Sequence, residues 1–114
     1  MTSNDYLAYL ADLFFQRGRV EMSLELECES LMSFEKCLEY DNEHYNACIQ
    51  VANLRLMLGE NKCAAKYFSY AMTIQKDSIL AFLGLIESVR REKINRIFPK
   101  FNFEEYFKLS LIHI

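Results

Sequence analysis

The chain has 114 residues, enough for one domain, and 52% of them are hydrophobic, which excludes a disordered protein. With only three Gly and one Pro, the composition predicts an all-α fold. No apolar run approaches the roughly 20 residues that cross a bilayer, and the acidic start does not resemble a secretory signal. We therefore expect an intracellular protein of the cytoplasm or of a cilium, with no membrane partner.

The formal net charge of −3 is unevenly distributed along the chain. Up to His44, three basic side chains oppose ten acidic ones, whereas five basic residues lie close together between Arg90 and Lys100. A basic cluster can bind an acidic partner or a phosphate backbone, although cations also suit the C-terminal end of a helix. Because the chain as a whole is acidic, we expect a solvated helix end and no nucleic-acid partner.

Amphipathic helices are predicted from the start of the chain onward. The stretches from Tyr6 to Phe15 (YLAYLADLFF) and from Ala47 to Leu58 (ACIQVANLRLML) carry apolar residues at steps of three and four. A glycine follows each stretch, and glycine readily adopts the left-handed conformation that ends many helices. We therefore expect these two helices to end at Gly18 and Gly59.

The rest of the chain repeats itself at a spacing of 34 residues. One group of small, aromatic and apolar residues recurs in the same order: Ser30, Phe34, Cys37 and Leu38 return as Ala64, Phe68, Ala71 and Met72. A second group does the same: Ala47, Cys48 and Val51 return as Ala81, Phe82 and Leu85. Small residues let two helices approach closely and the aromatic residue fills the space between neighbouring pairs. The repeat therefore predicts stacked helix pairs.

The first copy of the pattern is longer than the second. Leu7, Leu10, Ala11 and Gly18 correspond to Cys48, Val51, Ala52 and Gly59 at a spacing of 41 residues, so the first copy holds seven additional residues. Seven residues turn a helix through about 700°, close to two full turns, so an apolar stripe stays on one side. We expect a helix lengthened by two turns within Val20–Ser30. A seven-residue surface loop is the alternative.

The pattern resembles the tetratricopeptide repeat (TPR), in which a W-x2-L-G-x2-Y helix precedes an A-x3-F-x2-A helix. The residues that carry the resemblance are Leu10, Ala11, Phe14, Ala64, Phe68 and Ala71. The departures are Leu7 and Cys48 at the Trp positions, Arg55 at a usual aromatic, and Asn42 and Lys76 at the closing prolines. The resemblance implies about two and a half repeats within residues 1–91, stacked as a short right-handed superhelix (an α-solenoid). Sel1-like or pentatricopeptide-type repeats are the alternative.

The pattern stops after Arg91, where a divergent segment, 92–108, is interrupted by Pro99. A fresh helix is predicted behind Asn102, an N-cap with Glu105 three residues later. The last six residues, LSLIHI, match the translation of a transposon-end sequencing adapter. We expect adapter read-through at 109–114, with an amphipathic tail as the alternative. Repeat arrays usually need about three units and a cap, which indicates a fragment of a larger multi-repeat scaffold.

Residues that could carry catalysis are not arranged for it. His44 lies in a turn, the four cysteines show no CxxC spacing, and there is no Gly-rich phosphate loop or metal-binding His/Glu motif. Cys37 and Cys48 fall at core positions, so we expect buried free thiols. We expect no enzyme activity, no cofactor and no metal.

The resemblance implies that the first helix of each pair lines a concave groove, where a segment of a partner protein binds. The positions that match the family's groove are Asp12, Phe15, Gln16, Asn46, Ile49, Asn53, Leu56, Met57, Glu87 and Arg90. Asn53 can hydrogen-bond a peptide backbone through both amide groups, and Phe15, Leu56 and Met57 offer apolar contacts. Packing against a neighbouring repeat is the alternative role of these side chains.

Acidic chaperone C-terminal tails are not expected partners. Family members that bind them use a clamp of Lys, Asn, Asn, Lys and Arg, and the matching positions are Ala8, Asp12, Gln50, Leu80 and Gly84. None supplies a cation, and Asp12 would repel an acidic peptide. The expected role is a protein-binding scaffold. Substrate-recruiting repeats of an enzyme, with its catalytic domain outside this chain, and self-association through the end helices are the alternatives.

Overall fold

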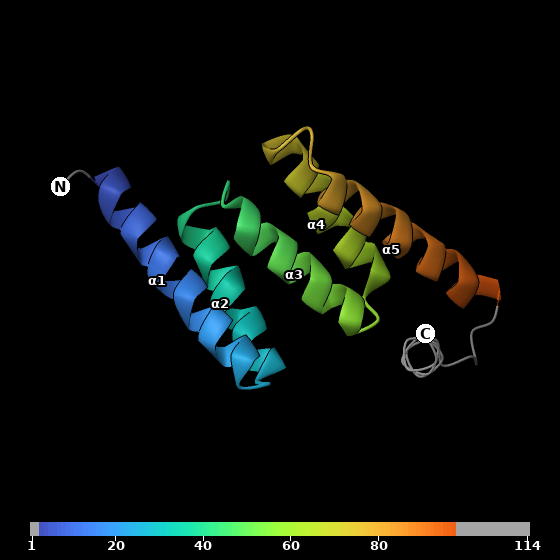
Figure 1. The fold of residues 1–114 in the computed structure, drawn as a ribbon, viewed down its shortest axis with the longest axis horizontal. Helices are drawn as coiled ribbons and strands as arrows, with labels where there is room; N and C mark the ends of the chain where they lie inside the picture. Colours follow the sequence, from blue (N-terminus) through green and yellow to red (C-terminus); the bar gives the residue numbers. More distant parts are fainter. Residues whose placement is uncertain (1–2, 98–114) are drawn as a thin grey trace.

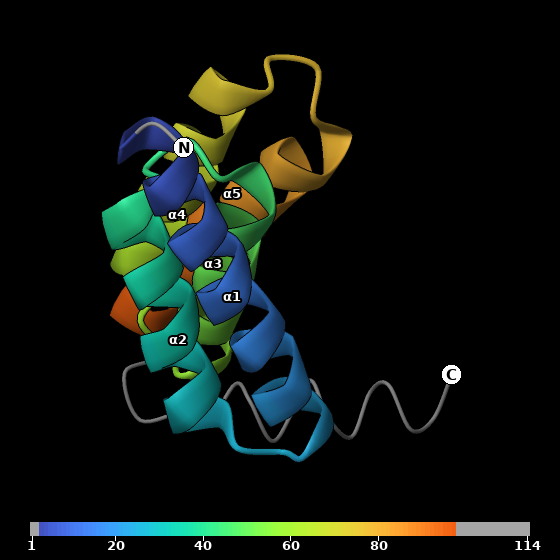
Figure 2. The same ribbon diagram turned by 90° about the vertical axis from the view of Figure 1, so that its left-hand side faces the viewer.

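The computed structural model describes residues 3–97, which form five helices packed in chain order (Figure 1). They are α1 (Ser3–Ser23), α2 (Glu27–Tyr40), α3 (Tyr45–Met57), α4 (Asn61–Ile74) and α5 (Ile79–Ile97). Seen from the N-terminal side, α1 and α2 form the nearest pair and α3, α4 and α5 lie behind it (Figure 2). The predicted all-α fold is confirmed. The predictions for 98–108 and 109–114 lie outside the described residues.

The residues that recur at 34 positions form the core. Phe34 of α2 and Phe68 of α4 are both 1% exposed. Each is flanked on its own helix by two small residues that are completely buried: Ser30 and Cys37 in α2, and Ala64 and Ala71 in α4. The predicted packing of an aromatic ring between close helices is therefore confirmed. Burying one such ring stabilises the fold by about 1.5–3 kcal/mol.

The predicted end of the third helix at Gly59 is confirmed by its geometry. Gly59 has a φ of 80°, and its N–H donates to the carbonyl of Leu56 at 3.1 Å. The next N–H, from Glu60, donates to the carbonyl of Arg55 at 2.9 Å. These two bonds satisfy carbonyls that the helix would otherwise leave without partners.

The predicted end of the first helix at Gly18 is wrong. The helix continues to Ser23, and Glu25 takes the left-handed position instead, with a φ of 61°. The same pair of capping bonds forms there: Glu25 N–H donates to Met22 at 3.0 Å and Leu26 N–H to Glu21 at 2.9 Å. The cap thus lies seven residues beyond Gly18, and α1 has 21 residues where α3 has 13.

Gly18 serves helix packing instead of helix termination. A Cβ atom on Gly18 would lie 2.6 Å from Cε1 of Phe34, so only a residue without a side chain lets the ring approach α1. Gly84 of α5 stands in the same relation to Phe68, with its hypothetical Cβ 2.3 Å from Cε1 of that ring. Both core aromatic rings are therefore packed against a glycine in a neighbouring helix.

The fifth helix continues beyond the last residue of the repeat pattern. It runs without a break through Arg91 and ends at Ile97, six residues later. Its buried residues are Ala81 and Ser88, and it packs mainly against α4. Phe82, which the repeat aligns with the buried Cys48, is 49% exposed, because no helix among residues 3–97 covers that side of α5.

Replacing Glu25 by Gly should stabilise the protein by about 0.5–1 kcal/mol, since a left-handed backbone is costly for a residue with a Cβ atom. Thermal unfolding followed by circular dichroism measures the change. The matched control is Glu29→Gly in the exposed first turn of α2, which should destabilise by a similar amount. Destabilisation by Glu25→Gly would contradict the assigned cap.

Replacing Gly84 by Ala should destabilise the protein by up to about 2 kcal/mol. Overpacking costs about 1–3 kcal/mol, and the roughly 1 kcal/mol that Ala gains over Gly in a helix offsets part of this cost. Urea unfolding of Gly84→Ala in the parent and in a Phe68→Leu background measures the clash. The loss should shrink in the Leu background; an equal loss in both would show that the ring of Phe68 is not its cause.

Candidate functional site

The groove residues predicted on α3 differ in their solvent exposure. Asn46 is exposed, Asn53 is half-buried and Met57 is 47% exposed. Leu56 is half-buried and packs against the core around Phe68. Two carboxamides, two turns apart, and a flexible apolar side chain one turn further on therefore lie on one side of α3.

Ile49 does not belong to this open surface. Its side chain is 4% exposed and lies in the same core cluster as Cys48, Ala52 and Ala81. Ala81 belongs to α5, which contacts α3 here and so contributes to the burial of Ile49. The alternative role, packing against a neighbouring repeat, is the one the structure gives to Ile49.

On α1, the predicted site residues surround an aromatic contact. Asp12 and Gln16 are exposed, and Phe15 lies half-buried between them. The ring of Phe15 is 5.5 Å from that of Phe34 and 4.7 Å from the imidazole of His44, measured between centroids. Phe15 thus joins the α1–α2 pair to the start of α3 and keeps only part of its ring available to a partner.

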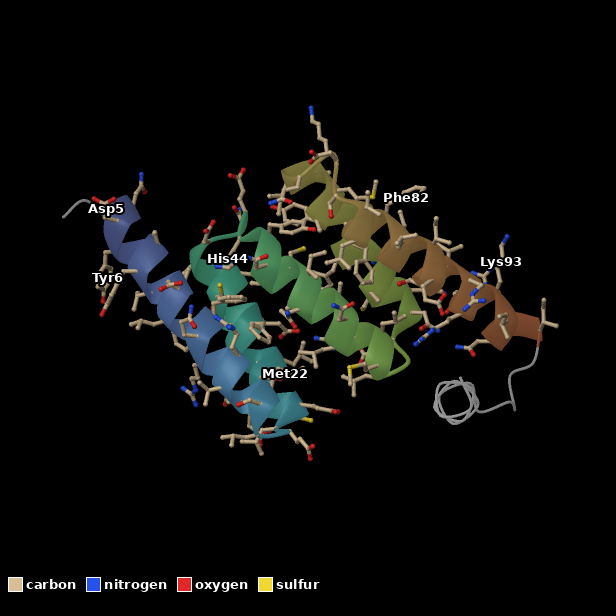
Figure 3. All side chains as sticks on the ribbon, in the orientation of Figure 1. Asp5, Tyr6, Met22, His44, Phe82 and Lys93 are labelled. Carbon is tan, nitrogen blue, oxygen red and sulfur yellow. The ribbon has the colours of Figure 1, made fainter. Side chains whose placement is uncertain are left out.

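His44 has a structural role at the junction of the two repeats. It is the N-cap of α3, where its Nδ1 accepts a hydrogen bond of 3.0 Å from the N–H of Ala47 (Figure 3). This bond satisfies one of the donors that the first turn of a helix leaves unpaired. The same imidazole packs on Phe15, and this contact fixes the direction of α3 relative to the first helix pair.

The predicted residues of α5 form a small charged network. Glu87 accepts hydrogen bonds of 2.9 Å from both Arg90 and Arg91. Burial raises the pKa of the Glu87 carboxyl, but the bonds and charges of the two guanidinium groups outweigh burial, and the pKa lies below its ordinary value. Glu87 is therefore ionised at neutral pH and holds Arg90 along the helix.

A second network, which the repeat pattern does not predict, lies on another side of the molecule. Arg55 forms ion pairs with Glu35 of α2 and with Glu60, which precedes α4. It borders a pocket of about 460 Å³ between α2, α3 and α4, which Tyr67 and Tyr70 also line. Arg55 stands where the repeat usually has an aromatic residue, and here its ion pairs connect α3 to α2 and to the start of α4. The sequence indicates this network only through the charge of Arg55 within an apolar stripe.

The cysteines separate into two buried and two exposed thiols. Burial raises the pKa of Cys37 to about 12 and that of Cys48 to about 11. Cys48 also donates from Sγ to the carbonyl oxygen of Tyr67 at 3.1 Å. Both thiols are therefore protonated at neutral pH and poor nucleophiles. Within residues 3–97, no group of three His, Cys, Asp or Glu side chains could hold a metal ion.

Comparisons with known proteins identify the fold. No protein-family model matches the chain, and no curated protein matches it in sequence. The structure is similar to the solved structure of the first TPR domain of Spaghetti (RPAP3) bound to the HSP90 peptide SRMEEVD. The TM-score is 0.69 at 14% sequence identity, over 93% of this chain and 92% of that one. The predicted TPR-type fold is thereby confirmed. No helix within the described part of the chain is long and apolar enough to cross a membrane.

Proposed function

We propose that this TPR-type chain is a protein–protein interaction module that binds a segment of a partner along the face of α1, α3 and α5. The proposal rests on the solvent exposure of side chains on α3. Its other sides are buried by α2 and α4, yet Asn46, Asn53 and Met57 remain accessible in the middle of the array. A face that keeps uncharged polar groups beside an exposed apolar side chain suits a peptide ligand.

The two carboxamides have the spacing that an extended segment requires. Seven residues of helix separate Asn46 from Asn53, which corresponds to about 10 Å along the helix axis. An extended chain advances about 3.3 Å per residue, so the same distance spans about three of its residues. Each carboxamide can both donate to and accept from a peptide bond, so the pair can bind a backbone at two points, independently of its side chains.

The neighbouring side chains would give this binding some selectivity. Met57 and the accessible part of Phe15 offer apolar contacts, and a thioether adapts to differently shaped partners. Asp12 of α1 is exposed and unfavourable to an acidic segment. Arg90 of α5 is half-exposed and paired with Glu87, so its charge is partly neutralised on this face. We therefore expect a segment that is apolar and near neutral in charge. The structural similarity to a domain solved with a bound peptide supports the same mode of binding.

Panning the full chain against a random 12-residue peptide library tests the proposal. Replacing Asn53 by Ala should weaken binding of the selected peptides about tenfold, because a lost pair of hydrogen bonds costs about 1–2 kcal/mol. The matched control is Ser69→Ala on the exposed side of α4, which should leave affinity unchanged. Peptides that bind both variants as tightly as the parent would place the site elsewhere.

The peptide SRMEEVD provides a second test, this time of selectivity. None of the five clamp positions carries a cation, and Gly84 is packed against the Phe68 ring, so it cannot accept a larger side chain without displacing that ring. We expect a dissociation constant weaker than about 1 mM by isothermal titration calorimetry. Replacing Asp12 by Asn should improve any residual binding, since it removes a repulsive charge. Micromolar binding by the parent chain would contradict the expected selectivity.

A further inference from the structure

The outer side of α1 is apolar and open to solvent, and no helix among residues 3–97 covers it. Tyr6, Tyr9, Leu13 and Val20 are 55%, 55%, 47% and 58% exposed. In Figure 1 α1 lies at the edge of the array, and Figure 3 shows Tyr6 projecting from α1 on the side away from α2. Isolated apolar residues are common on protein surfaces, but a row along one side of a helix usually marks a contact surface.

The spacing of these residues is typical of a helix that packs against another helix along its length. Tyr6, Leu13 and Val20 are seven residues apart. Tyr9 and Gln16 lie three residues after the first two of them, so steps of three and four residues alternate from 6 to 20. This alternation keeps one side of a helix in contact with a long, nearly parallel or antiparallel partner helix. No charged residue interrupts the row.

Two opposite charges flank the row on the same side. Asp12 precedes Leu13 and Arg19 precedes Val20, so the two charged residues are seven positions apart and occupy equivalent places beside the row. Both are exposed, and neither forms an ion pair within the described part of the chain. Arg19 donates a hydrogen bond of 3.3 Å to Gln16 of its own helix. The flank is therefore acidic towards the start of α1 and basic towards its end, which makes it complementary to its own reverse.

We propose that two copies of this chain associate through α1, with the two α1 helices antiparallel about a two-fold axis. The axis passes between positions 14 and 15, so that Leu13 of each copy contacts Gln16 of the other and Val20 contacts Tyr9. In this register Asp12 of each copy lies beside Arg19 of the other. The symmetry makes the two ion pairs equivalent, and the same surface serves both copies, so the association stops at a dimer.

A parallel pair of α1 helices satisfies the charges less well. It would bring Asp12 beside Arg17 of the other copy, and the guanidinium of Arg17 is already 3.7 Å from the carboxylate of Glu21 in its own helix. Arg19 would then remain without an acidic partner. The dipoles of the two helices would also point in the same direction, whereas an antiparallel pair places opposite ends together. The antiparallel arrangement is therefore the one that the charges of α1 favour.

The open side of α5 is less suited to a second copy. Phe82, Ile86 and Val89 are exposed there, but the same side of the helix continues into Lys93 and Arg96. In an antiparallel pair of α5 helices these cations would face apolar side chains, which is unfavourable because a charge loses its hydration there. The row on α1 carries no such charge, so α1 is the surface that fits its own copy.

Sedimentation velocity of the full chain over a concentration series tests the proposal. One helix from each copy gives a small interface, so we expect a monomer–dimer equilibrium with a dissociation constant of about 10–100 µM. Leu13→Asp with Val20→Asp should weaken association at least about tenfold, since both place charge in the apolar row. The matched control, Ile86→Asp with Val89→Asp, replaces two similarly exposed apolar residues of α5 and should leave the dissociation constant unchanged.

A charge exchange between copies tests the antiparallel register. Asp12→Arg alone and Arg19→Asp alone should each weaken association at least about tenfold, because like charges then meet at two places in the dimer. An equimolar mixture of these two variants should associate about as tightly as the parent chain, since each contact again joins opposite charges. Circular dichroism of each variant confirms that its helices are intact.

Three outcomes would overturn the proposal. The first is a parent chain that remains a monomer up to about 500 µM. The second is a mixture of the two charge variants that associates no more tightly than either variant alone, which is also the result expected of a parallel pair. The third is formation of species larger than a dimer, or an equal loss of association from the Asp substitutions on α1 and on α5, because either would indicate head-to-tail contact between these two helices. Peptide binding to α3 is measured independently, so these outcomes leave the proposed function untouched.

Discussion

The arrangement of the helices depends on two phenylalanine rings that are packed against bare backbone. Phe34 and Phe68 are buried between small residues of their own helices, and each ring faces a glycine in a neighbouring helix, Gly18 or Gly84. Because protein cores are close-packed, a ring that meets backbone on one side fixes the distance between the helices. The direction of α5 relative to α4, and with it the placement of the proposed binding face, follows from the contact of Phe68 with Gly84.

Polar contacts complete the connection between the repeats, where α2 and α3 pack less extensively than the other sequential helices. Arg55 pairs with Glu35 in the preceding helix pair and with Glu60 at the start of the next helix, so one side chain holds three elements together. His44 acts in a similar way, capping α3 through Nδ1 while its ring packs on Phe15. Such contacts are directional, whereas apolar burial is not. They therefore define the angle between the repeats more than they add to their stability.

Periodicity in the sequence predicts the parts of the fold that repeat. Phe34, Phe68 and their small neighbours are recognisable because each occupies the same position in a recurring packing unit. The prediction for Gly18 is wrong because a glycine behind an apolar helix suits both a cap and a close approach to a ring, and only the neighbouring helix decides between them. The cap at Glu25 cannot be recognised in the sequence, because glycine is the residue usually expected in a left-handed conformation. Ile49 shows the same limit: its burial depends on α5, to which the local pattern around residue 49 is insensitive.

The positions of the cysteines allow the unfolding of this chain to be followed by the reactivity of its thiols. Cys28 and Cys63 are exposed, whereas Cys37 and Cys48 are buried on helices that face the core. A maleimide reagent should modify two thiols in the native protein and four once the helices separate. Since Cys37 lies in α2 and Cys48 in α3, the order in which these two become reactive distinguishes opening of the first helix pair from loss of the second. The cooperativity between neighbouring repeats can thus be followed without adding any label to the sequence.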